Sequence, residues 1–267
     1  MNRPLKENTF EFSQCPWSIK DVFIVFIYAI TLFFVFCFWL TVFYFLMSFI
    51  GKWSFQAWRH TLLELLKGAE DFYAVLLFYA ALFIAMKIKI FKKYKIREFD
   101  FFIRKDKVKE DIFYGFLMYL KFIAIMITGI VLAFFIATIW DMTFGSKILE
   151  KVNVFFIASD LEKLGLEERG VGVVSVVVLF ILAPFFEELF FRGCLYRALR
   201  VHFSRSLAIA SSSFIFSLLH GYFFLFVYVF LVGLFLAYMY EKRKSLVAPL
   251  TFHMLNNLVV VILFLFR

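Results

Sequence analysis

The sequence predicts an all-α fold, a polytopic bundle of about seven or eight transmembrane helices with a cavity that faces the cytoplasm. Of the 267 residues, 64% are hydrophobic and 18% are charged, whereas soluble domains are about 45–50% apolar and about 25% charged. The mean hydropathy is +0.88. In addition, the apolar residues fall into long runs that are separated by linkers rich in Lys and Arg.

The amino-terminal part of the chain contains three long apolar runs, at 22–50, 72–90 and 112–140. Because about 20 apolar residues in a helix span the hydrocarbon core, each run predicts one transmembrane helix. The first run is too long for the core of a cleaved signal peptide, so we interpret it as a retained anchor. The stretch 52–71 is amphipathic and predicts a helix at the membrane interface.

The carboxy-terminal part contains shorter apolar runs and more polar residues. Four helices are expected there, at 171–200, 207–219, 222–240 and 246–266. The second of these is too short to cross the bilayer, and Gly221 follows His220 directly. We therefore expect it to end part-way through the membrane at His220, with the next helix returning to the cytoplasmic side.

Basic residues predict how the helices are oriented. The stretch 87–109 holds ten Lys or Arg residues and three acids, and cytoplasmic loops are enriched in Lys and Arg. Placing this stretch in the cytoplasm also places the amino terminus and the basic linkers at 192–205 and 242–244 there, and the 141–170 loop outside. The basic surface is expected to contact anionic lipid headgroups. We expect no nucleic-acid partner, because no soluble domain is available to present that surface.

Ionisable side chains are rare inside membrane helices and are usually functional. The fourth predicted helix carries Glu187-Glu188-Leu-Phe-Phe-Arg192. Glu188 and Arg192 are four residues apart, so they share a helix face and can form an ion pair. Glu187 is rotated by about 100° from Glu188, which leaves its carboxylate to face a different neighbour.

Two histidine motifs follow in the later helices. Phe216 and His220 form F-x-x-x-H, and His253 and Asn257 form H-x-x-x-N. A lone histidine in an apolar run is usually a structural hydrogen-bonding residue. Two of them with a paired carboxylate, all in neighbouring helices, instead favour a functional site.

Distances along the helices indicate that these groups can meet. Glu187 and His220 each lie about 16 residues from a turn expected at 203–204, so at about 1.5 Å per residue both are about 25 Å along their helices. His253 lies about 15 Å along its own helix. We therefore expect the three motifs to converge in the cytoplasm-facing cavity.

In this order, the three motifs resemble those of the CAAX protease and bacteriocin-processing (CPBP) family of glutamate-dependent intramembrane peptidases. The matching positions are Glu187, Glu188, Arg192, Phe216, His220, His253 and Asn257. The resemblance covers about residues 171–266, and the polar positions all fit the pattern. A single membrane domain over 1–267 is the simplest division, with amino-terminal helices and loops at 1–170. The resemblance implies that 171–267 is a catalytic helical core.

The resemblance also implies a mechanism for peptide-bond hydrolysis. Glu187 is expected to act as the general base on a water molecule, and His220 to help hold or activate that water. His253 and Asn257 are expected to donate hydrogen bonds to the developing oxyanion.

This mechanism requires no cofactor, and we favour a metal-free site. Glu187, His220 and His253 are nevertheless ligand types that suit zinc, so a zinc ion held by these three is the alternative. The sequence contains no H-E-x-x-H, and its three cysteines include no C-x-x-C, so common zinc motifs are absent. Glu188 and Arg192 are expected to be supporting residues whose ion pair orients the helix.

Two other functions fit parts of the pattern. A transporter or proton relay also uses Glu and His in membranes, but the first three predicted helices hold almost no charge at their centres. A non-catalytic membrane adaptor, such as an immunity protein, would keep the fold and use the motifs structurally. Replacing Glu187 with Gln separates the adaptor from the peptidase, because only the peptidase needs the carboxylate.

The expected partners are membrane lipid and a substrate, which is a peptide or a lipidated protein cleaved near the cytoplasmic face. We expect a multi-pass integral membrane protein whose amino terminus is cytoplasmic. A bacterial plasma membrane is the favoured location over the eukaryotic endoplasmic reticulum.

Overall fold

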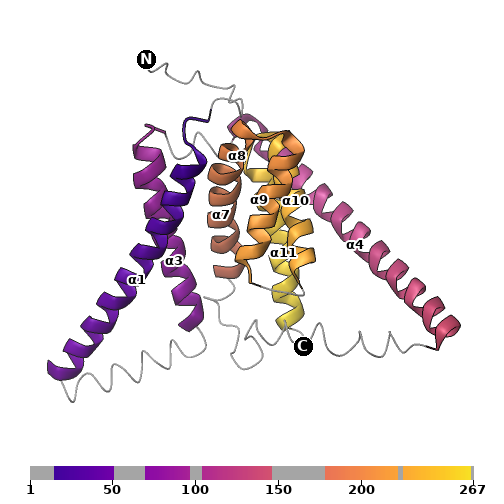
Figure 1. Cartoon of the computed structure of the whole chain (residues 1–267), viewed down its shortest axis with the longest axis horizontal. Helices are drawn as coiled ribbons and strands as arrows, with labels where there is room; N and C mark the ends of the chain where they lie inside the picture. The colour runs from indigo at the N-terminus through magenta and orange to yellow at the C-terminus, as the bar shows by residue number, and fades with distance from the viewer. Residues whose placement is uncertain (1–14, 51–69, 97–103, 146–177, 222–224, 266–267) are drawn as a thin grey trace.

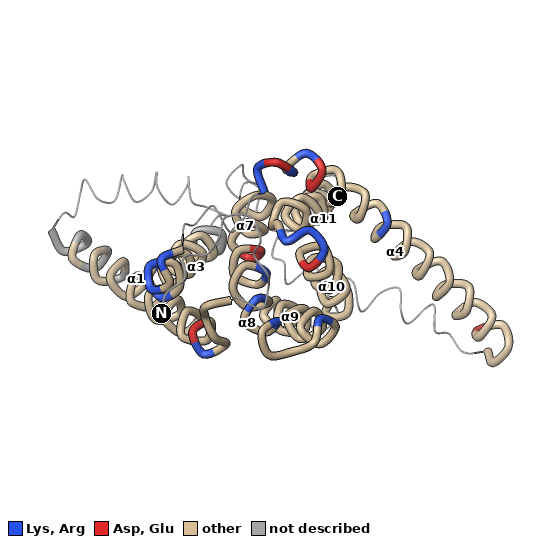
Figure 2. The backbone as a smooth tube through the Cα atoms, turned by 90° about the horizontal axis from the view of Figure 1, so that it is seen from above, with Lys and Arg blue, Asp and Glu red and all other residues tan. Residues whose placement is uncertain are grey.

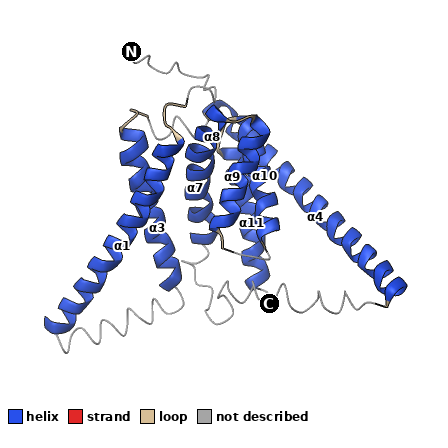
Figure 3. Cartoon of the chain, viewed as in Figure 1, coloured by secondary structure: helices blue, strands red, loops and turns tan. Residues whose placement is uncertain are grey.

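The computed structural model describes residues 15–50, 70–96, 104–145, 178–221 and 225–265. Helices account for nearly all of these residues, and no strand occurs among them (Figure 3). The predicted all-α membrane bundle is confirmed. Three described stretches are long and apolar enough to cross a membrane, and these are Ile19–Leu40, Ala74–Lys92 and Lys105–Phe144.

The helices match the predicted runs closely. In chain order they are α1 (Ile19–Ile50), α3 (Glu70–Met86), η2 (Lys87–Lys92), η3 (Lys105–Lys107), α4 (Val108–Phe144), η4 (Val178–Leu182), α7 (Ala183–Glu188), η5 (Leu189–Tyr196), α8 (Arg197–His202), α9 (Arg205–Leu219), α10 (Phe226–Arg243) and α11 (Val247–Leu265). Most of the predicted interfacial helix at 52–71 and of the loop at 141–170 lies outside the described residues.

A central group of helices is flanked by two arms (Figure 1). The central group consists of α7 to α11, with α1 and α3 paired on one side and α4 on the other. The buried residues of α4 are Asp111, Gly115, Tyr119 and Phe122, which recur every three or four positions and therefore lie on one helix face. All four fall in the first half of α4, so only that half packs against the bundle.

Gly115 allows α4 to approach α11 closely. A Cβ atom at this position would lie 2.4 Å from the backbone oxygen of Ala248, a distance that no side chain tolerates without a shift of the helices. One to two turns further on, the rings of Tyr119 and Phe122 each lie 5.4 Å from the ring of Phe252. The glycine and these aromatic contacts fix where α11, and hence His253, sits in the bundle.

The central helix from Val178 to His202 is continuous, but its winding changes. The segments η4 and η5 are π-helical and flank the α-helical α7. Pro184 lies in the first turn of α7, where its missing N–H interrupts the regular hydrogen-bond ladder. Short π-helical insertions inside helices are often found at functional sites. All eight residues of η5 are buried, so other helices surround this segment.

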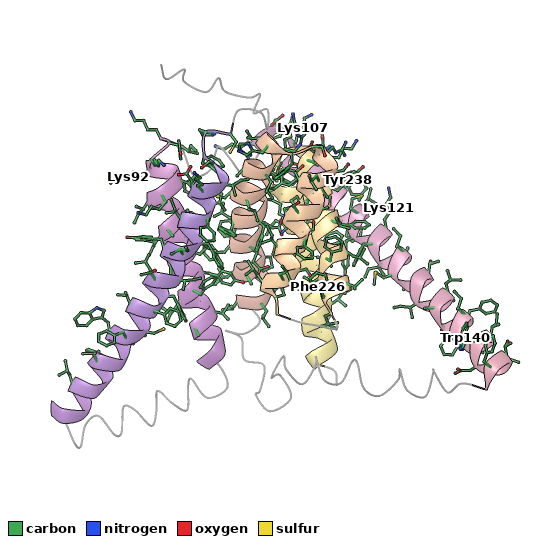
Figure 4. All side chains as sticks on the ribbon, in the orientation of Figure 1. Lys92, Lys107, Lys121, Trp140, Phe226 and Tyr238 are labelled. Carbon is green, nitrogen blue, oxygen red and sulfur yellow. The ribbon has the colours of Figure 1, made fainter. Side chains whose placement is uncertain are left out.

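Lys and Arg residues occur in η2, in η3 and in the last turn of α10 (Figure 2). Figure 4 shows Lys92 and Lys107 at one end of the molecule and Trp140 near the opposite end. The ammonium of Lys93 lies 2.7 Å from Asp21 Oδ1, which joins the start of α1 to the residues after η2. That hydrogen bond raises the pKa of Lys93. At the same end, the guanidinium of Arg243 donates to the buried Asp111.

Candidate active site

Two histidine side chains converge on one carboxylate oxygen of Glu187. Glu187 Oε2 on α7 lies 3.8 Å from His220 Nε2 and 3.7 Å from His253 Nε2 on α11. His220 is the residue at which α9 ends, and the chain turns at once through Gly221, whose φ is +70°. The turn at 203–204 also lies where the sequence predicts it, because Ser204 caps the start of α9.

The neighbouring carboxylate, Glu188, makes different contacts. Its Oε1 accepts hydrogen bonds from Arg192 at 3.0 Å and from the Nδ1 of His253 at 2.8 Å. The side chains of Glu188 and Arg192 are each only 1% exposed. Arg192 also donates to the backbone oxygen of Gly233 on α10 at 3.3 Å. The pair expected at four-residue spacing is therefore present, and it links α7, η5, α10 and α11.

The hydrogen bonds of the two histidines determine which nitrogen faces Glu187. The Nδ1 of His220 lies 2.7 Å from the backbone oxygen of Phe216, and the Nδ1 of His253 lies next to the Glu188 carboxylate. Both neighbours accept hydrogen bonds, so Nδ1 carries the hydrogen in each ring. In the neutral form of each ring, Nε2 then presents a lone pair toward Glu187.

The ring of Phe216 packs against both histidines and the buried arginine. Its ring centroid lies 4.4 Å from that of His220 and 5.9 Å from that of His253. The guanidinium carbon of Arg192 lies 4.6 Å from the same centroid, which is within the range of a cation–π contact. The aromatic residue of the F-x-x-x-H motif thus packs against three of the polar residues of the site.

Residues 169–259 match the model of the type II CAAX prenyl endopeptidase Rce1-like family. This segment of the chain is similar to the Rce1-like family. The match confirms the resemblance inferred from the three motifs and spans nearly the same residues. Glu187, Glu188, Arg192, His220, His253 and Asn257 all lie inside the matched segment.

Searches of curated proteins and of solved structures found no match to the chain. At the family level, the match over the carboxy-terminal segment indicates peptidase activity. The amino-terminal helices α1, α3 and α4 lie outside the matched residues.

Asn257 has a contact that the sequence did not predict. Its Nδ2 donates to the backbone oxygen of Leu179 in η4 at 2.9 Å, which ties the middle of α11 to the start of the central helix. The side-chain amide carries a second hydrogen, so the contact with Leu179 does not use all of its donors. Its predicted role at the oxyanion stays a prediction. The adjacent Asn256 accepts a hydrogen bond from Tyr228 at 2.6 Å.

Tyr79 on α3 contacts the site but belongs to none of the three sequence motifs. Its hydroxyl donates to Glu187 Oε1, and its ring stacks on Phe186 at 5.6 Å between centroids. In the sequence, Tyr79 is one aromatic residue inside a long apolar run, with no polar neighbours to distinguish it. Only the packing of α3 against α7 identifies it.

A zinc ion held by Glu187, His220 and His253 would require shorter distances between their ligand atoms. Zinc binds nitrogen and oxygen ligands at about 2.0–2.1 Å, which in a tetrahedral site places ligand atoms about 3.4 Å apart. The two separations from Glu187 Oε2 are longer, at 3.7 and 3.8 Å. Among the described residues, no group of three His, Cys, Asp or Glu side chains has an arrangement that could hold a metal ion. The described geometry therefore does not support a metalloprotease.

Two surface grooves lie away from these residues. One, of about 420 Å³, runs between α4 and α11, and the other, of about 440 Å³, lies along η2. Glu187, His220 and His253 line neither groove. The predicted cavity that opens toward the cytoplasm stays a prediction.

Proposed function

We propose that the chain is an intramembrane endopeptidase that uses Glu187 to activate water and cleaves a membrane-associated or lipidated substrate. The observation that carries this proposal is the approach of two histidine Nε2 atoms to a single oxygen of Glu187, at 3.7 and 3.8 Å. These separations are too long for direct hydrogen bonds and suit one bridging water molecule. Glu187 Oε2 is buried and has no hydrogen-bond partner among the described residues.

In the proposed reaction, Glu187 Oε2 takes a proton from the water as the water oxygen attacks the carbonyl carbon of the peptide bond. The new C–O bond converts that carbon to a tetrahedral intermediate with a negatively charged oxygen. The C–N bond then breaks, and the proton held by Glu187 moves to the leaving nitrogen. Water is thus added across the peptide bond, and Glu187 is regenerated as a carboxylate.

His220, His253 and Asn257 assist this sequence. His220 accepts a hydrogen bond from the water through Nε2, because its Nδ1 hydrogen is bound to the backbone oxygen of Phe216. His253 and Asn257 are assigned to the oxyanion. His253 donates through Nε2 only as an imidazolium, because its Nδ1 hydrogen is directed at Glu188. Each donor to a developing oxyanion typically contributes about 3–4 kcal/mol of transition-state stabilisation.

The end of the bundle that holds Lys92 and Lys107 (Figure 4) is assigned to the cytoplasm, because cytoplasmic ends of membrane proteins carry excess Lys and Arg. This orientation puts the amino terminus in the cytoplasm and the substrate's cleavage point within reach of that face.

The proposal is tested by incubating the purified protein in detergent with a farnesylated peptide that ends in a CAAX sequence, and with the same peptide unprenylated. The wild type is expected to cleave at least one of them, and Glu187→Gln neither. Equal cleavage by the two proteins would reject Glu187 as the base. Cleavage of both peptides at equal rates would show that the prenyl group is not recognised.

A further inference from the structure

The two oxygens of Glu187 have different surroundings. Oε2 faces the Nε2 atoms of His220 and His253. Oε1 points toward α3, where it accepts a hydrogen bond from the hydroxyl of Tyr79. One oxygen of the carboxylate therefore faces the two histidines, and the other accepts a hydrogen bond from a tyrosine.

Tyr79 is itself held in place by aromatic packing. It is 8% exposed, and its ring lies nearly parallel to that of Phe186, with an interplanar angle of 15°. On the next turn of α3, Phe83 packs edge-on against the same Phe186 ring at 5.9 Å. Phe78 packs against Phe33 of α1 at 6.1 Å. The hydroxyl of Tyr79 thus approaches Glu187 from a packed helix pair rather than from a loop.

Such a donor restricts a flexible side chain. A glutamate side chain has several rotatable bonds and loses rotamer entropy when it is held in one conformation. A catalytic base must lie within hydrogen-bond reach of the proton that it removes, and a misplacement of about 1 Å can reduce the rate about 100-fold. A single hydrogen bond to Oε1 leaves the Oε2 lone pairs directed at the histidines.

We propose that Tyr79 is a positioning residue for Glu187, holding Oε1 so that Oε2 is presented to His220 and His253. This inference rests on the proposed peptidase function. It also assigns part of the site to α3, which lies outside the segment that matches the Rce1-like family. The amino-terminal helices then complete the active site rather than only anchoring it.

The test compares Tyr79→Phe with Tyr119→Phe. Both tyrosines are similarly buried, at 8% and 7% exposed, and both rings pack against a phenylalanine. The Tyr119 ring, however, packs edge-on against Phe252 of α11, whereas the Tyr79 hydroxyl reaches Glu187. Removing the Tyr79 hydroxyl is expected to lower kcat by about 10- to 100-fold with little change in KM. Tyr119→Phe is expected to keep the wild-type kcat. A wild-type kcat in Tyr79→Phe would overturn the positioning role.

A purely structural role for Tyr79 is separated from positioning by thermal unfolding in detergent. Tyr79→Phe keeps the stacked ring, so its unfolding temperature is expected to stay near that of the wild type while kcat falls. Tyr79→Leu removes the ring and is expected to lower both. Should the two variants lose kcat only in proportion to lost folded protein, Tyr79 supports the fold and does not position Glu187.

The pairing of Tyr79 with Glu187 has a readout that does not depend on catalysis. In protein labelled with ¹³C at tyrosine Cζ, the Tyr79 signal is assigned by its loss in Tyr79→Phe. This signal is expected to move in Glu187→Gln, because the hydroxyl then donates to a neutral amide instead of a carboxylate. An unmoved signal would overturn the pairing. If the signal moves in Glu187→Gln but the wild type cleaves no peptide, the pairing is supported and the peptidase function is rejected.

Discussion

The imidazole of His253 donates through Nδ1 to Glu188 Oε1 at a distance of 2.8 Å. The other nitrogen of the same ring lies 3.7 Å from Glu187 Oε2. One histidine therefore contacts both members of the adjacent glutamate pair, at its two different nitrogens. The contact with Glu188 orients the ring, and the contact with Glu187 places that ring in the proposed reaction centre.

Changing Glu187 to glutamine is expected to affect mainly peptide cleavage, whereas changing Glu188 to glutamine is expected to affect mainly the stability of the fold. Glu187→Gln removes the proposed base, so peptide cleavage should fall to background while the protein stays folded. Glu188→Gln leaves the buried Arg192 charge unpaired, and loss of one partner of a buried ion pair typically costs about 3–5 kcal/mol. Cleavage assays and unfolding in mixed detergent measure the two effects.

A matched control for Glu188→Gln is Arg104→Ala, which removes an exposed ion pair. The side chains of Arg104 and Asp106 are 42% and 68% exposed, and such surface pairs contribute about 0–1 kcal/mol. Equal loss of stability in the two variants would contradict the importance of burial at Glu188.

The two histidines should differ in how much stability they provide. The His220 side chain is 26% exposed at the end of α9, whereas that of His253 is 4% exposed and bound to Glu188. His220→Ala and His253→Ala should each reduce kcat at least about 100-fold. Only His253→Ala should also lower the unfolding temperature clearly, because it leaves a cavity and removes one of the two hydrogen bonds to the buried Glu188 Oε1. A wild-type kcat in either variant would remove that histidine from the mechanism.

Two glycines of α4 provide a direct test of how closely this helix packs on α11. Gly115→Ala places a methyl group where a Cβ would lie 2.4 Å from the Ala248 oxygen, so overpacking should destabilise the protein by about 1–3 kcal/mol. Gly129→Ala has nothing within 4 Å of the added Cβ and should be neutral or stabilising by up to about 1 kcal/mol. Equal stabilities in mixed-detergent unfolding would show that the contact with α11 is looser than described.

Metal removal is expected to leave cleavage unchanged. The separations of 3.7 and 3.8 Å from Glu187 Oε2 favour a bridging water over a zinc ion. Dialysis against a strong chelator should therefore preserve kcat, and elemental analysis of the purified protein should find much less than one zinc per chain. Loss of activity on chelation that added zinc restores would overturn the metal-free mechanism.

The positions of the helices and the identity of the main polar residues follow from local properties of the sequence. Hydropathy and helix period depend on neighbouring residues only, and the predicted runs therefore match α1, α3, α4, α9, α10 and α11. Glu187, His220 and His253 are conspicuous because polar side chains are rare in such runs. The four-residue spacing of Glu188 and Arg192 likewise predicted a pair that forms within one helix.

Contacts between helices distant in sequence could not be predicted in this way. Tyr79 meets Glu187 across 108 positions of the chain, and Asn257 meets Leu179 across 78. These pairs depend on the relative rotation of two packed helices, which the helix period of either one does not specify. The sequence by itself determined a membrane helix bundle and identified Glu187, His220 and His253 as polar residues within it. Only the tertiary structure decided which oxygen of Glu187 faces the histidines, because α3 supplies the hydrogen bond that holds the other.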